Sequence, residues 1–222
     1  VPLKKIVEQT FHLPTFIEND ANLAALGEQK WGVGQGFEHF ILLTLGTGVG
    51  TGLILNGKLH RGLKALGGEG GHLLIPHHKK RTCSCGGENH LECYLSAKGI
   101  LRTIQEEISA EWTLEELGRH FKNHHPDAEK IMKIISYELA SALSSMAVLC
   151  APEAFIIGGG ISLLGENFIE MIKDQFNFMV HYSLKNQINI LTAKHSSQLG
   201  AIYGGAALIM DECKTLISSE TK

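Results

Sequence analysis

The sequence has few cysteines, no long basic run, no internal repeat and no apolar run of membrane-spanning length, and each shortage argues against a class of protein. Five cysteines, an odd number and unevenly spread, do not make a disulfide framework and favour a reducing cytoplasm. A net charge of −3 without a basic run gives no sign of a nucleic-acid surface. No signal peptide opens the chain, and we expect no membrane span.

The composition is that of a folded protein with a sizeable core. Apolar residues make up 44% of the 222 residues and charged residues 19%, which is ordinary for a globular chain of one large domain or two small ones. Cys150 and Cys213 stand in apolar helical patterns, so we expect both thiols to be buried.

Helical and strand patterns alternate along the chain, which is typical of an α/β fold. Helices are expected over 3–10, 21–30, 96–108, 128–149, 165–179 and 200–217, with a short helix within 109–127. Strands are expected over 14–17, 39–45, 49–55, 154–157 and 188–192, with 58–60 returning after the Asn56-Gly57 turn. Residues 61–95 read as a long functional loop held by something other than a core.

Twenty-five glycines are gathered in clusters, which mark turns and places where backbone approaches a ligand. The stretch LTLGTGVGTG (43–52) puts glycines and threonines in a hairpin turn that can offer N–H groups to phosphate, although it lacks the lysine of a Walker P-loop. The stretch IIGGGIS (156–162) follows a buried strand. It serves either as a tight turn or as a close approach for a planar or phosphorylated ligand.

A carboxylate stands at a predicted helix start in FIENDANLAALGE (16–28). Either Asn19 or Asp20 begins the helix, and an aspartate there is favoured by the helix dipole. Asp20 is therefore either a simple cap or a functional carboxylate.

Cysteine and histidine gather in the glycine-rich loop. His72, Cys83, Cys85 and His90 can form a tetrahedral Cys2His2 zinc set, with Cys93 competing with His90 for the fourth position. The alternative is that these are unliganded surface residues. The pairs His77-His78 and His124-His125 are interpreted as solvated loop residues.

Five motifs together resemble the ROK family of sugar kinases and sugar-responsive repressors. They are ENDAN (18–22), LGTGVGTGLILNGKLHRG (45–62), GGEGGH (67–72), CSCGGENHLECYLS (83–96) and IIGGGIS (156–162). The resemblance implies an α/β fold of the actin-like ATPase (ribonuclease H-like) type. Residues 1–36 would be a remnant of the small N-terminal domain, 37–199 the large domain with the zinc loop, and 200–222 a helix returning to the small domain.

The resemblance also implies roles for single residues in an ATP-dependent kinase acting on a glucose-like hexose or an N-acetylhexosamine. Asp20 would be the general base. The sugar would be held by Asn19, Glu69, His72 and Glu92. The nucleotide phosphates would lie on Gly46, Thr47, Gly48 and Gly50, and the adenosine beside Gly158, Gly159 and Gly160, with Mg²⁺ accompanying ATP.

A structural zinc ion is implied as well, held by His72, Cys83, Cys85 and His90. His72 would then give one ring nitrogen to zinc and the other to the sugar side. The family commonly has a third cysteine where this chain has His90, and Cys93 would be a bystander.

One motif of the family is missing: the Asp-x-Gly-Gly-Thr phosphate segment of its first strand. The expectation is therefore either a fragment of a longer protein or a degenerate member. The competing functions are the sugar kinase, the sugar-sensing part of a repressor, and a non-catalytic zinc-stabilised binding module. We expect a homodimer, no membrane partner and no nucleic acid bound by this segment.

Overall fold

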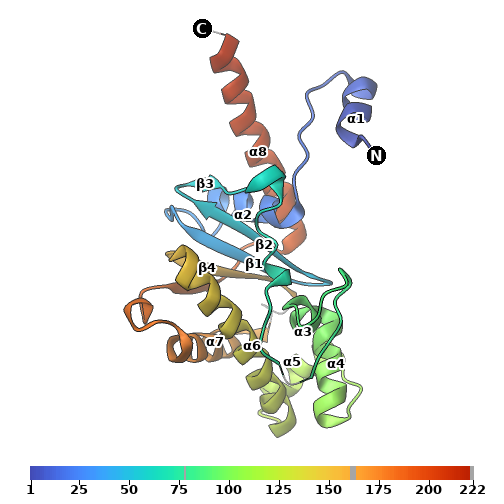
Figure 1. Cartoon of the computed structure of the whole chain (residues 1–222), viewed down its shortest axis with the longest axis vertical. Coiled ribbons are helices and arrows are strands. Elements are labelled where there is room, and N and C mark those ends of the chain that lie inside the picture. Colours follow the sequence, from blue (N-terminus) through green and yellow to red (C-terminus); the bar gives the residue numbers. More distant parts are fainter. Residues whose placement is uncertain (78, 161–163, 221–222) are drawn as a thin grey trace.

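The computed structural model describes residues 1–77, 79–160 and 164–220, with side chains described as far as residue 214. A five-stranded sheet crosses the molecule in the order β3-β2-β1-β4-β5 (Figure 1). Strands β1, β4 and β5 are parallel, while β2 and β3 run antiparallel to their neighbours. The strands are β1 (Phe40–Leu45), β2 (Val49–Leu55), β3 (Lys58–Leu59), β4 (Ala154–Gly159) and β5 (Asn189–Thr192).

Helices cover both faces of this sheet (Figure 1). The α-helices are α1 (Leu3–Phe11), α2 (Asp20–Trp31), α3 (Glu92–Leu95), α4 (Ala97–Ile108), α5 (Leu114–Lys122), α6 (Pro126–Cys150), α7 (Glu166–Met179) and α8 (Ser197–Glu220). Short 3-10 turns lie at Leu63–Ala65, Gly70–His72 and Tyr182–Leu184.

Alternate residues of each central strand enter two separate cores. Phe40 and Leu42 of β1 pack on α2 and α8, whereas Ile41 and Leu43 pack on the other side of the sheet. Because both faces are covered, the central strands are apolar at nearly every position rather than alternating with polar residues.

The face covered by α2 and α8 is here called the small-residue face, since its helices contribute mainly alanine, glycine and leucine. The two helices meet at their backbones. A Cβ on Gly27 would stand 2.3 Å from the Gly200 oxygen, and one on Gly204 would stand 1.7 Å from the Leu23 oxygen. Only glycine permits this approach.

The opposite face, covered by α3 to α7, is here called the large-residue face. Its buried residues are mostly isoleucine, leucine, phenylalanine and methionine. Among the described residues, α6 is the one helix long and apolar enough to cross a membrane by length and composition, which the sequence analysis did not expect. In its most apolar window 61% is buried within the fold, so core packing accounts for that composition.

Most predicted elements are confirmed, and four predictions are wrong. Residues 14–17 form no strand: the N–H of Thr15 donates to the Glu8 side chain at 3.2 Å instead of to a neighbouring strand. Residues 61–95 are not a loop held without a core: they include α3 and the first two 3-10 turns, and Ile75 and Leu91 enter the core.

The two remaining errors concern cysteine and histidine. Cys213 is exposed, and Cys150, the last residue of α6, is only half-buried. His77 is largely buried, with 10% of its side chain exposed, whereas His78 lies outside the described residues. The division into 1–36, 37–199 and 200–222 stays a prediction.

Candidate active site and Cys/His cluster

Two glycine segments meet at one edge of the sheet. In the parallel pairing of β1 with β4, Leu45 stands opposite Gly159, so the turn that begins at Gly46 and the glycines at the end of β4 lie side by side. Gly159 has φ +90°, and a Cβ there would lie 2.2 Å from the Leu45 oxygen. The structure thus brings together the two predicted nucleotide segments, Gly46–Gly50 and Gly158–Gly160.

Helix α2 delivers Asp20 to the hairpin that carries the first of these turns. Asn19 caps the helix, and its Oδ1 accepts the N–H groups of Ala21 at 2.8 Å and Asn22 at 3.3 Å. A Cβ on Gly50 would stand 2.8 Å from the Ala21 Cβ, so the first turn of α2 lies directly on β2. Asp20 follows the cap and is exposed, as a group that meets a substrate must be.

The chain before α2 is tied to the loop after β3 by a carboxylate that the sequence analysis left without a role. Glu18 accepts from Arg61 Nε at 2.5 Å and from Asn22 Nδ2 at 2.9 Å. Burial alone would raise the pKa of Glu18, but these hydrogen bonds from Asn22 and Arg61 hold it below its ordinary value. The signal was present in the sequence, since Glu18 opens the ENDAN motif.

The GGEGGH segment lies flat against β2. A Cβ on Gly71 would stand 2.2 Å from the Val49 oxygen, and the Gly70 N–H donates to Thr51 Oγ1 at 2.9 Å. The Thr51 hydroxyl in turn donates to the Gly68 oxygen. These contacts fix the segment that carries Glu69 and His72.

Glu92, the first residue of α3, also contacts the hairpin of β1 and β2. Its Oε2 accepts from the Val49 N–H at 3.1 Å, and a Cβ on Gly48 would stand 2.6 Å from that oxygen. Glycine at position 48 therefore makes room for the Glu92 carboxylate. The predicted sugar residue Glu92 and the predicted phosphate turn are in direct contact.

The four predicted zinc ligands lie together, with one ligand atom of each within 4.8 Å of the others. Nδ1 of His72 stands 3.2 Å from Nδ1 of His90 and 3.8 Å from Sγ of Cys83, and Sγ of Cys85 stands 3.2 Å from Nδ1 of His90. Ligand atoms around a tetrahedral zinc ion stand about 3.3–3.8 Å apart, and these three separations lie close to that range.

The chemistry of the donors also fits a metal. Burial would raise the pKa of the Cys83 thiol, but hydrogen bonds from the Cys85 backbone and from the side chains of His90, Cys85 and Ser84 lower it to about 6. A thiolate is the form that ligates zinc. The Nε2 of His72 points away from the cluster, 3.9 Å from Glu69.

A buried arginine anchors the cysteine loop to α4, and the sequence analysis missed it. The Arg81 guanidinium donates to the Cys93 and Gly99 oxygens at 3.0 and 2.9 Å, and to Glu106 at 2.8 Å. It also lies 4.6 Å from the centre of the Tyr94 ring. These partners are dispersed along the sequence, so only the folded chain reveals the burial of Arg81.

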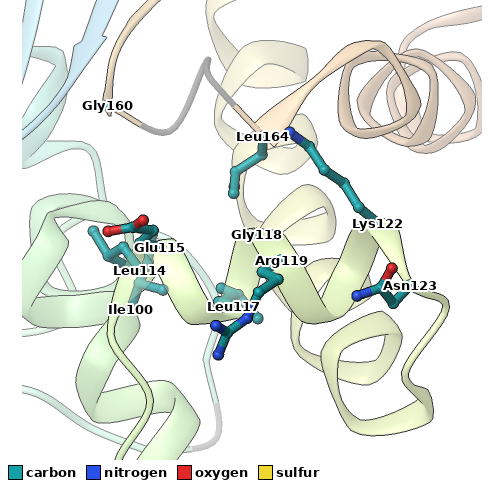
Figure 2. A pocket seen from close by; sticks show the side chains of 10 residues that line it. All are labelled: Ile100, Leu114, Glu115, Leu117, Gly118, Arg119, Lys122, Asn123, Gly160 and Leu164. Atoms are coloured by element: carbon teal, nitrogen blue, oxygen red, sulfur yellow. The ribbon is translucent and has the colours of Figure 1, made fainter.

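A cavity of about 600 Å³ opens beside the second glycine turn (Figure 2). Figure 2 shows Gly160 and Leu164 on one side and the side chains of α5 on the other. Apolar residues include Ile100 and Leu117, while Arg119 and Lys122 supply positive charge. The cavity has the size and lining of a small-molecule pocket.

A profile of the ROK family matches residues 1–212. The chain belongs to the ROK family. Its relatives include the glucokinase of Halalkalibacterium halodurans, which is 31% identical over 100% of this chain and 71% of the glucokinase. A xylose repressor of Caldicellulosiruptor bescii is also 31% identical, over 86% of this chain and 52% of the repressor.

Among solved structures, a ROK glucokinase from Streptomyces griseus, crystallised with glucose and AMPPNP, matches with a TM-score of 0.81 at 29% identity. The match covers 91% of this chain and 70% of that one. The predicted fold class is confirmed: this ROK protein has the actin-like ATPase fold of the family's sugar kinases. The relatives include both kinases and repressors, so membership of the family alone does not choose between the two activities.

Proposed function

We propose that this ROK protein is an ATP-dependent sugar kinase that transfers the γ-phosphoryl group of ATP to a hydroxyl of a glucose-like hexose or an N-acetylhexosamine. The observation that carries the proposal is the meeting of three parts at one sheet edge. These are the turn after β1, the glycines at the end of β4, and the α2 terminus with its exposed carboxylate.

On the sugar side, Asp20 takes the proton from the attacking hydroxyl, because phosphoryl transfer needs a positioned nucleophile and mild base assistance. The Oδ1 of Asn19 is used in capping α2, which leaves its Nδ2 to donate to a sugar oxygen. Glu69, His72 and Glu92 complete the hydrogen bonds to the sugar.

On the nucleotide side, the phosphates lie against the turn of Gly46, Thr47, Gly48 and Gly50, which the Gly46 N–H closes by donating to the Gly48 oxygen at 3.0 Å. Gly158–Gly160 border the adenosine, whose base has room in the cavity beside Gly160. Mg²⁺ arrives with ATP and supplies charge neutralisation at the phosphates when bound.

Zinc has a structural role in this proposal. The Nδ1 of His72 belongs to the Cys/His cluster while its Nε2 faces Glu69, so an ordered cluster fixes the orientation of a sugar-binding imidazole. The test of this coupling is direct: chelation of zinc should weaken sugar binding as well as loosen the loop.

The second candidate function is the sugar-sensing part of a ROK repressor. It is favoured by the similarity to the C. bescii xylose repressor. A sugar sensor needs the sugar-binding side chains but no general base at position 20. The effect of replacing Asp20 therefore distinguishes the two proposals. Cytoplasmic location and homodimer formation stay predictions.

The deciding experiment measures ADP release from the protein with magnesium-ATP across a panel of hexoses and N-acetylhexosamines. We expect sugar-dependent release, with the best sugar identifying the substrate. Asp20→Asn should lower turnover by about 10²–10⁴-fold and leave sugar binding, measured by calorimetry, within about twofold. Sugar binding without ADP release in the unmodified protein would favour the sensor, and unchanged turnover in the variant would remove Asp20 from its role.

A further inference from the structure

A second cavity lies on the large-residue face, between α6, α7 and the segment before the cysteine loop. Its volume is about 560 Å³. Among the described residues it shares no lining residue with the cavity beside Gly160 or with the predicted sugar and nucleotide residues. Its lining is Pro76, His77, Lys130, Lys133, Ile134, Tyr137, Glu138 and Gln175.

A buried carboxyl group forms part of this lining. Glu138 is 3% exposed, and within the described residues neither of its oxygens makes a hydrogen bond. His77 Nε2 lies 3.0 Å from Oε1, close enough for an ion pair but poorly aligned for a hydrogen bond. A buried polar group without a partner costs free energy of folding. We therefore expect Glu138 to form a hydrogen bond with a bound ligand.

Of the two Glu138 oxygens, Oε2 is the one without a neighbouring donor among the described residues. The Lys79 backbone holds the other side of the His77 ring, with its nitrogen 3.0 Å and its oxygen 3.1 Å from Nδ1, and Nε2 of the ring faces Glu138 Oε1. Burial raises the pKa of Glu138 to about 8, with Arg81 lowering it and Glu107 raising it, so this carboxyl keeps its proton at neutral pH.

Two cations and an aromatic ring stand at the mouth of the cavity. Lys130 pairs with Glu107 at 3.2 Å, whereas Lys133 is exposed and makes no ion pair with a described residue. Tyr137 is 50% exposed. The cavity therefore offers a neutral polar group inside, an apolar and aromatic wall, and positive charge outside.

These features select one class of ligand. The lysines repel a cation, and a purely apolar molecule leaves Glu138 without a partner. An inorganic anion such as phosphate fills little of the volume. A hydroxyl group can accept from the protonated carboxyl or donate to the ionised one, and a phosphate group matches lysine.

We propose that this cavity binds a small polyhydroxylated phosphomonoester, a sugar phosphate, with its hydroxyls on Glu138, its ring on Tyr137 and its phosphate on Lys133. This site is separate from the proposed kinase site. The inference does not depend on the proposed function, because it concerns binding alone.

The test is a calorimetric titration of the protein with glucose 6-phosphate in the presence of saturating glucose, which occupies the proposed sugar site. We expect saturable binding that is about tenfold weaker in Lys133→Ala and in Tyr137→Ala. Both side chains are exposed, so these variants keep the fold. Glu138→Leu should weaken binding to a similar extent.

The matched control is Lys173→Ala on α7, which removes the same charge from a lysine that pairs with Glu170 at 2.7 Å and does not line the cavity. Its affinity should stay within about twofold of the unmodified protein. The proposal is overturned if no binding is seen at millimolar glucose 6-phosphate or if Lys133→Ala leaves the affinity unchanged. It is equally overturned if inorganic phosphate alone binds as tightly, which would show a general anion contact at lysine.

Discussion

On the small-residue face, α2 and α8 approach until backbone meets backbone, whereas on the large-residue face the helices are held apart by isoleucine, leucine and phenylalanine side chains. Backbone contact fixes a helix position tightly but leaves no room for one extra methyl group. Large side chains bury more apolar area and adjust when one of them is shortened. The catalytic candidate Asp20 stands on the tightly fixed helix, and the bulk of the core lies on the other face.

The largest effect is expected from a cavity on the large-residue face. Leu139→Ala removes a fully buried side chain of α6 and should cost about 2–5 kcal/mol of unfolding free energy in urea denaturation. Turnover per folded molecule should stay near its original value, because α2 is not moved. The control is Leu149→Ala on the same helix, where the side chain is 82% exposed and the change should stay within about 0.5 kcal/mol. An equal loss of unfolding free energy in both variants would contradict the placement of Leu139 in the core.

The next largest effect on the unfolding free energy is expected from zinc binding to the cysteine loop, which lies on the same face. Cys83→Ser removes one of the four clustered ligands, so the bound zinc measured by atomic absorption should fall well below one equivalent. At free zinc 100-fold above the Kd the metal stabilises the fold by about 2.7 kcal/mol, which the variant should lose. Cys93→Ser is the control, since Cys93 does not belong to the four-residue cluster. A full equivalent of zinc in Cys83→Ser would count against the ligand set.

The small-residue face is tested by two adjacent glycines of α8. Gly204→Ala places a Cβ 1.7 Å from the Leu23 oxygen, so α2 and α8 must separate. We expect a loss of about 1–3 kcal/mol in unfolding free energy. We also expect reduced turnover per folded molecule, because Leu23 lies one helical turn from Asp20.

Gly205→Ala is the matched control, since outside the backbone of its own helix no atom lies within 4 Å of the added Cβ. Alanine should there stabilise the helix by up to about 1 kcal/mol. If both variants lose stability equally, backbone contact is not what fixes α2.

The smallest effect is expected at Glu138 and depends on pH. Its pKa is about 8 in the folded protein against an ordinary value of 4.5, so between these values the unfolded chain releases a proton that the folded chain retains. Wild-type stability should therefore fall as pH rises from about 5 to 8. The groups around this carboxyl are His77, Arg81, Glu107, Lys130 and Lys133.

Glu138→Gln does not titrate at this position. Relative to wild type, its unfolding free energy should rise by roughly 1–2 kcal/mol between about pH 6.5 and pH 8, measured by urea denaturation at several pH values. A difference that stays constant with pH would show that Glu138 has an ordinary pKa in the folded protein.

Local patterns were sufficient to predict most of the fold. Apolar runs ending in glycine predict β1, β2 and β4, and the ENDAN motif predicts the start of α2. The strand prediction for PTFI (14–17) was wrong because these residues favour a strand but have no neighbouring strand to pair with. Strand propensity reflects how well side chains fit a sheet surface, whereas pairing requires a second strand from another part of the chain.

The site was predictable where its residues sit in compact motifs and unpredictable where contacts cross the fold. His72, Cys83, Cys85 and His90 lie within one short loop, and the structure gathers them. The burial of Arg81 depends on α4, which lies further along the chain, and Glu138 is packed against the segment around His77, which lies well before it. Arginine and glutamate usually stand in solvent, so sequence alone gives the wrong expectation for both.

The pairing of Leu45 with Gly159 has a consequence for how the protein is made. About half of the chain separates the two glycine turns, and they become neighbours only when β4 joins β1. Contacts of such long range form late in folding. During synthesis, the ribosome must release α6 and β4 before any nucleotide can find both turns. If the proposed nucleotide site is correct, nucleotide can stabilise the chain only after β4 has joined β1, and the onset of nucleotide binding would report that step of assembly.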